Sequence, residues 1–72
     1  MDLRTFVDLI KKKRKQQNIK YFDFIERIGF SEYKYKARIA NPGKFTLEEA
    51  FVIMDVLHFT KEERMGIFCE NS

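Results

Sequence analysis

Two short segments carry the residues best suited to bind a polyanion. Residues 11–15 read Lys-Lys-Lys-Arg-Lys, and Lys34, Lys36 and Arg38 alternate with other residues further along the chain. Residues 1–40 hold eleven Lys/Arg against five Asp/Glu (+6), residues 41–72 hold three against six (−3), and these sum to the net charge of +3. The basic half indicates a polyanionic partner, although a solvated helix end explains part of the first run equally well. The acidic half suits a basic protein surface.

Residues that could catalyse a reaction are few. The paired carboxylates are Glu48-Glu49 and Glu62-Glu63. Adjacent residues of a helix point in different directions, so neither pair can share one substrate. One histidine, His58, and one cysteine, Cys69, can form neither a four-ligand zinc site nor an intrachain disulfide. We therefore predict no enzyme activity, catalytic residue, cofactor, metal ion or small-molecule substrate.

Periodic apolar residues predict a single all-α domain of five helices over residues 1–72. The first spans residues 2–17, with Asp2 as its N-cap and with Leu3, Phe6, Val7 and Ile10 on its buried stripe. A second helix over residues 20–28 ends at Gly29. Ser31 then caps a third helix that runs to residue 40. Asn41-Pro42-Gly43 predicts a break after it.

Two capping boxes predict the last two helices. Thr46 with Glu49 begins the fourth, and Thr60 with Glu63 begins a short fifth that carries Met65 and Phe68. The buried face of the fourth helix is predicted to consist of Leu47, Ala50, Phe51, Met54 and Leu57. No apolar run approaches the ~20 residues that span a bilayer, and the N-terminus lacks a secretory apolar region. We expect no membrane partner and a cytoplasmic location in a bacterial host cell.

Residues 21–39 resemble the helix-turn-helix of the Cro/cI-type (XRE-like) phage repressors, with Gly29 in the turn and Ser31 at the cap of the recognition helix. The resemblance covers about residues 3–59. It includes Arg14 in the first helix, the turn Asn41-Pro42-Gly43-Lys44 and the capped segment Thr46-Leu47-Glu48-Glu49. It implies a lambda-repressor-like DNA-binding fold with a helix-turn-helix core, acting in transcription regulation.

The resemblance also implies which residues would touch operator DNA, because a recognition helix reads base edges while flanking groups bind phosphates. The implied base-facing residues are Glu32, Tyr33, Lys34 and Ala37. The implied backbone-facing residues are Ser31, Arg14 and Lys44, and Arg38 could do either. Lys36 shares the same short helix, and Tyr21 lies beside it in the pattern. A homodimer is expected, since the family reads paired half-sites.

Departures from the family pattern leave a second interpretation open. Ile25 and Ile39 replace a usual alanine and a usual acidic residue, and Lys20 replaces a polar helix cap. Five rings lie in or beside the helix-turn-helix: Tyr21, Phe22, Phe30, Tyr33 and Tyr35. A core this small cannot bury them all, and we expect Tyr35 to pack against the preceding helix. Exposed rings among cations are typical of protein–protein hot spots. The same face could therefore bind a cI-type repressor, as phage modulators of repression (antirepressors) do in the lysis–lysogeny switch.

Overall fold

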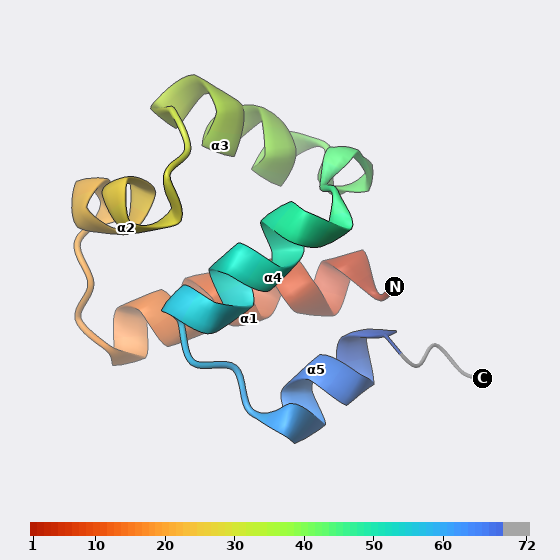
Figure 1. Cartoon of the computed structure of the whole chain (residues 1–72). Helices are drawn as coiled ribbons and strands as arrows, with labels where there is room; N and C mark the ends of the chain where they lie inside the picture. The colour runs from red at the N-terminus through yellow and green to blue at the C-terminus, as the bar shows by residue number, and fades with distance from the viewer. Residues whose placement is uncertain (69–72) are drawn as a thin grey trace.

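Five α-helices and one short 3-10 helix account for most of residues 1–68, the part of the chain that the structure, a computed structural model, describes (Figure 1). The helices are α1 (Leu3–Gln16), α2 (Tyr21–Ile28), α3 (Glu32–Ala40), the 3-10 helix η1 (Pro42–Lys44), α4 (Leu47–Val56) and α5 (Lys61–Phe68). No β-strand occurs among these described residues. The prediction of an all-α, five-helix chain is confirmed.

Three of the α-helices, α1, α4 and α5, begin at the side-chain caps that the sequence predicts. The Asp2 carboxylate accepts a hydrogen bond from the backbone N–H of Thr5 at 3.1 Å, which caps α1. Thr46 and Glu49 exchange the two hydrogen bonds of a capping box at the start of α4. Thr60 and Glu63 do the same before α5, at 2.8 and 3.1 Å. Each cap satisfies N–H groups that a helix leaves without partners in its first turn.

A three-residue turn joins α2 to α3. Gly29 ends α2 with φ of 75°, in the left-handed region that a residue with a Cβ adopts only at a steric penalty. The Ser31 hydroxyl then accepts a hydrogen bond from the backbone N–H of Lys34 at 3.1 Å and starts α3. The predictions that Gly29 ends the second helix and that Ser31 caps the third are confirmed.

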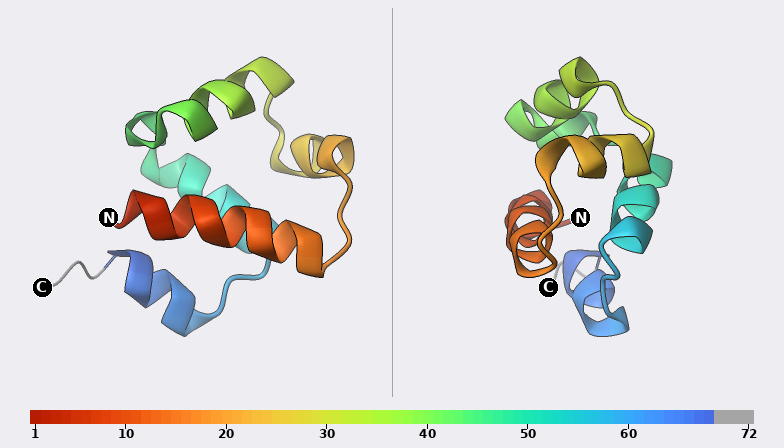
Figure 2. Two further views of the ribbon diagram at one scale, coloured as in Figure 1. Left: turned by 180° about the vertical axis from the view of Figure 1, so that it is seen from behind. Right: turned by 90° about the vertical axis from the view of Figure 1, so that its left-hand side faces the viewer.

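The helices lie in three levels, and two views agree on their order (Figures 1 and 2). The α1 and α4 helices occupy the middle, α2 and α3 lie on one side of them, and α5 lies on the other. The Asp2 N–H donates to the Ile67 carbonyl at 2.7 Å, which ties the start of α1 to the end of α5. This arrangement leaves the long outer side of α3 facing solvent.

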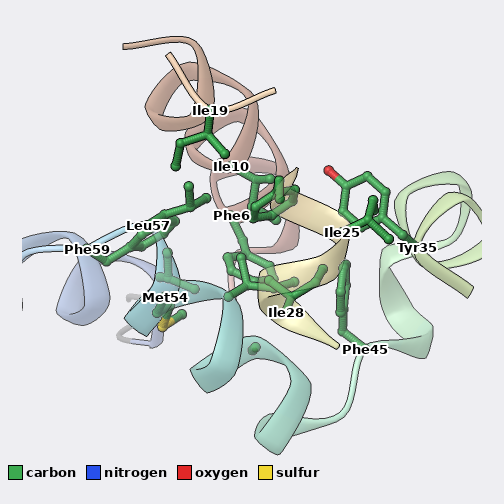
Figure 3. Close-up of a cluster of buried hydrophobic side chains, with 14 residues drawn as sticks. Phe6, Ile10, Ile19, Ile25, Ile28, Tyr35, Phe45, Met54, Leu57 and Phe59 are labelled. Carbon is green, nitrogen blue, oxygen red and sulfur yellow. The ribbon is translucent and has the colours of Figure 1, made fainter. Parts of the chain in front are cut away.

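Aromatic rings organise the buried core between the helices (Figure 3). Phe6 of α1 is fully buried, and its ring meets those of Phe45 and Phe59 edge-on, at centroid distances of 5.2 and 6.1 Å. Edge-to-face pairs are a favoured arrangement of aromatic rings. Each of the five described α-helices contributes to this core: Ile10 from α1, Phe24 from α2, Tyr35 from α3, Met54 from α4 and Ile67 from α5.

The predicted buried face of α4 was partly wrong. Ala50, Met54 and Leu57 are buried as expected, but the buried stripe is completed by Ile53. Phe51 is 41% exposed and Leu47 is 56% exposed, so both lie beside the core rather than in it. Apolar residues surround most of α4, and two adjacent stripes fit a 3.6-residue period almost equally well. In α5, likewise, Ile67 is buried while Met65 is exposed.

Candidate functional site

The outer face of α3 is defined by the residue that the helix buries. Tyr35 is only 6% exposed, and its ring meets Phe24 and Tyr21 of α2 edge-on at 5.5 and 5.8 Å. Burial raises the pKa of the Tyr35 hydroxyl. The expectation that Tyr35 packs on the preceding helix is confirmed. Because Tyr35 points inward, Tyr33 and Lys36 point outward, and Tyr33 is 85% exposed.

Two of the α3 cations are held by one carboxylate of α4. Arg38 donates from Nε to Glu49 Oε1 at 3.0 Å and from Nη2 to Glu49 Oε2 at 3.3 Å. The ammonium of Lys34 lies 2.8 Å from Glu49 Oε2 and 4.4 Å from the centroid of the Phe30 ring. Only 12% of the Glu49 side chain and 24% of the Arg38 side chain are exposed. Paired geometry of this kind is stronger than a solvated surface ion pair.

Glu49 therefore makes three contacts, two ion pairs with α3 and one helix cap. Its Oε1 also accepts the backbone N–H of Thr46 at 2.9 Å in the capping box. The hydrogen bonds from Arg38, then those from Lys34 and Thr46, lower the pKa of Glu49 to about 2 despite partial burial. The carboxylate stays ionised at neutral pH, and it neutralises positive charge that α3 would otherwise present.

The third α3 cation is also paired. The Lys36 ammonium lies 3.1 Å from Glu32 Oε2, one turn earlier on the same helix. The hydrogen bond and charge of Glu32 raise the pKa of Lys36. Both side chains are exposed, at 68% and 43%, so this pair is weaker than the cluster of Lys34, Arg38 and Glu49, hereafter the Glu49 cluster. Ala37 lies half-buried on the same helix.

Arg14 and Tyr21, which the sequence also singled out, lie away from the Glu49 cluster. The Arg14 guanidinium donates to the Ile19 carbonyl at 3.3 Å and lies 5.7 Å from the centroid of the Tyr21 ring. Both residues line a groove of about 650 Å³ between α1 and the α2–α3 pair, and Lys36 forms part of its other wall. The groove thus brings together three of the ten predicted site residues.

Two further predicted residues flank α3, Ser31 before it and Lys44 in η1 after it. Ser31 is exposed, and its hydroxyl is engaged in capping the helix. Lys44 is exposed in η1 and forms no ion pair within the described chain. The ten residues therefore do not form one continuous site. Lys34 and Arg38 lie in the Glu49 cluster, Arg14, Tyr21 and Lys36 line the groove, Ser31 and Lys44 flank α3, and Glu32, Tyr33 and Ala37 lie along α3.

Sequence reasoning missed two features of this region. Glu49 was assigned only to a helix cap, although it also holds Lys34 and Arg38. The groove was not foreseen, since it requires the end of α1 to lie beside α3. The one available signal for Glu49 was its spacing from Thr46, which predicts the cap but not the second role.

Within residues 1–68, no three His, Cys, Asp or Glu side chains are grouped so as to hold a metal ion. None of the described helices is long and apolar enough to cross a membrane. Cys69 lies outside the described residues. Comparison of the chain with protein-family models, characterised proteins and solved structures gives no match.

Proposed function

We propose that this chain is a small phage-type regulator of a lysis–lysogeny switch that binds a cI-type repressor protein through the outer face of α3. The observation that carries the proposal is the character of that face. It presents the exposed ring of Tyr33, while carboxylates pair with all three α3 cations, Lys34, Lys36 and Arg38. The choice of a cI-type repressor as partner follows from the resemblance of residues 21–39 to that group of regulators.

Electrostatics disfavours DNA as the ligand of this face. Affinity for duplex DNA comes largely from cations that replace counterions at phosphates. Arg38 and Lys34 would have to leave a carboxylate at 2.8–3.3 Å before they could contact phosphate. Glu49 would then remain nearby as an uncompensated negative charge. Glu32 adds a second carboxylate to the helix that would enter the groove of DNA.

The exposed rings favour a protein ligand. Tyr33 is 85% exposed, and Phe22 on α2 is 69% exposed. Large rings of this kind are enriched at the centres of protein interfaces, where burial of one ring contributes strongly to affinity. Both lie in the α2–α3 pair rather than in the packed centre of the domain.

Operator DNA is the second candidate ligand, and a different surface favours it. Lys11, Lys12 and Lys15 at the end of α1 and Lys44 in η1 are exposed, and no ion pair within residues 1–68 engages them. Such cations can bind phosphates without reading bases. In that case the chain would act as a Cro-like repressor, a homodimer on paired half-sites.

Isothermal titration of the chain with the repressor encoded beside its gene tests the proposal. We expect a complex with a Kd below about 1 μM, corresponding to about −8 kcal/mol. Tyr33→Ala should weaken it by 2 kcal/mol or more, about thirtyfold, as loss of a hot-spot ring does. Leu47→Ala is the matched control, since it removes an exposed apolar side chain from α4. No heat of binding, or equal losses in the two variants, would refute the proposal.

A further inference from the structure

The groove between α1 and the α2–α3 pair is basic on both walls. Lys11, Arg14 and Lys15 line it from α1, and Lys36 lines it from α3 (Figure 2, left, shows α1 in front and α3 above it). No Asp or Glu is among the residues that line it. Lys36 is paired with Glu32, but Lys11, Arg14 and Lys15 form no ion pair within residues 1–68, and these three cations make the groove a site for a negatively charged ligand.

The rest of the lining is aromatic and aliphatic. Tyr35 is almost fully buried, Tyr21 and Ile39 are half-buried, and Ala40 is exposed at the edge. Because the lysines are exposed while the rings are half-buried or buried, the groove has a charged rim and an apolar floor. At about 650 Å³ it exceeds the size of a single inorganic anion.

A buried hydroxyl adds a polar group to that floor. The Tyr21 hydroxyl is buried and has no hydrogen-bond partner among the residues that the structure describes. Leaving a buried polar group without a partner is unfavourable, and few such groups occur in folded proteins. The Arg14 guanidinium over the same ring uses one donor on the Ile19 carbonyl, which leaves other donors for a ligand.

We infer that this groove binds an acidic segment of the protein partner, with carboxylate side chains between the lysines and an apolar side chain on the tyrosine floor. The inference rests on the proposed function, because it names the chemistry of the partner. The partner's carboxylates would meet Lys11 and Lys15 at the rim. One carboxylate would accept hydrogen bonds from Arg14 and, after displacing the side chains that cover it, from the Tyr21 hydroxyl.

Shape argues against duplex DNA as the occupant of the groove. The phosphates of a duplex lie on a broad convex surface, which can reach the lysines of the rim but not a buried tyrosine. A protruding side chain of a peptide can enter the groove. A single-stranded oligonucleotide could also place a base on the two rings, so it is included in the test as the competing ligand.

The test uses the full chain labelled with ¹⁵N and a short, capped peptide of alternating glutamate and leucine. We expect saturable shifts of the Tyr21 and Ile39 amide signals and of the Arg14 side-chain N–H signal. The same peptide with glutamine in place of glutamate should not bind. Lys11→Gln with Lys15→Gln should weaken binding about tenfold, the sum of two partly exposed ion pairs.

Two matched variants separate the groove from general charge and from folding. Lys12→Gln with Lys61→Gln removes the same charge from exposed lysines outside the groove, and it should change affinity less than about twofold. Tyr21→Phe should weaken binding about fivefold, as loss of one hydrogen bond does. It should not lower stability, because the hydroxyl that it removes has no partner in the described chain.

Three results would overturn the inference. The glutamine peptide could bind as tightly as the glutamate peptide, or the two double lysine variants could lose the same affinity. Oligothymidylate could also bind the groove more tightly than the acidic peptide. None of these experiments contains the repressor, so they can succeed where the repressor titration fails. Conversely, a repressor complex lost in Tyr33→Ala, without peptide binding in the groove, would keep the proposed function and reject the acidic segment.

Discussion

Arg38 of α3 holds both carboxylate oxygens of Glu49 of α4, at 3.0 and 3.3 Å. The same carboxylate caps α4 through Thr46 and pairs with Lys34. One side chain thus ties the third helix to the fourth, and it engages two cations of the face that the sequence pattern assigns to DNA, lowering their combined charge from +2 to +1. The structural and the functional consequences of this contact can be measured separately.

Glu49→Gln should destabilise the fold by about 2 kcal/mol, since it weakens the contacts to Arg38 and Lys34 that are shielded from solvent. Glutamine can still accept the Thr46 N–H, so the helix cap is retained. Urea unfolding followed by circular dichroism measures the change. Glu48→Gln, which makes the same change of charge on an exposed neighbour, should shift stability by less than about 0.5 kcal/mol. Equal losses of stability in Glu49→Gln and Glu48→Gln would mean that the Glu49 contacts do not stabilise the fold.

The stability of the fold should depend on pH through Glu49. Its pKa falls from 4.5 to about 2 because Arg38, Lys34 and Thr46 hydrogen-bond to the ionised form. A group with a lowered pKa in the folded state contributes stability above its unfolded pKa and loses it as pH falls through the folded value. We expect a loss of about 2–3 kcal/mol at most between pH 4.5 and about 2.

Comparison with Glu49→Gln isolates that contribution. Asp2 and Glu63 also have lowered pKa values, but they titrate in both proteins. The difference in unfolding free energy between the wild type and Glu49→Gln should shrink as pH falls through this range. A difference that stays constant from pH 6 to about 2 would contradict the assigned cause of the shift.

The sequence predicted helix boundaries well because the signals for them are local. Asp2, Ser31 and Thr46 each bond within three residues of their own position. The buried face of α4 depends instead on how the helix is rotated against α1 and α2. Phe51 and Ile53 are both apolar, and nothing local decides which of them enters the core.

The candidate site was less predictable for the same reason. Residue types correctly predicted a charged and aromatic α3. The spacing also predicted that Tyr35 packs in the core, while Tyr33 lies on the surface. The contact between Arg38 and Glu49 depends on how α3 lies beside α4, and the groove depends on the end of α1 lying beside α3. Such relationships between elements have no signature in the spacing of single residues.

Phe6→Ala should cost about 3–5 kcal/mol, the range for a fully buried ring. Phe51→Ala should cost only about 1 kcal/mol, because the ring is 41% exposed and its ring contact is with the partly buried Phe68. Urea melts of the two variants under one condition provide the comparison. Similar losses would show that Phe51 belongs to the core, as the sequence pattern had suggested.

Replacing each of two glycines with alanine should change the stability of the fold in opposite directions. Gly29→Ala should destabilise the fold by about 1 kcal/mol, because its φ of 75° penalises a Cβ although space for one exists. Gly66→Ala should stabilise it by about 1 kcal/mol, since Gly66 lies within α5 and a Cβ there meets no atom within 4 Å. Thermal melts of both variants test this pair, and changes of the same sign would contradict the backbone argument.

The central claim is that carboxylates engage the α3 cations and make them less available to DNA. Fluorescence anisotropy with a labelled duplex from the gene's own upstream region tests it most directly. The wild-type chain should bind weakly at about 50 mM salt, with a shallow dependence of affinity on salt. Glu49→Gln should bind the duplex more tightly. It should also steepen the slope of log K against log salt by about 0.9 for each cation that becomes free to contact a phosphate. Glu48→Gln should leave this slope unchanged. Tight, steeply salt-dependent binding by the wild type, unchanged in Glu49→Gln, would contradict the claim and favour a Cro-like repressor.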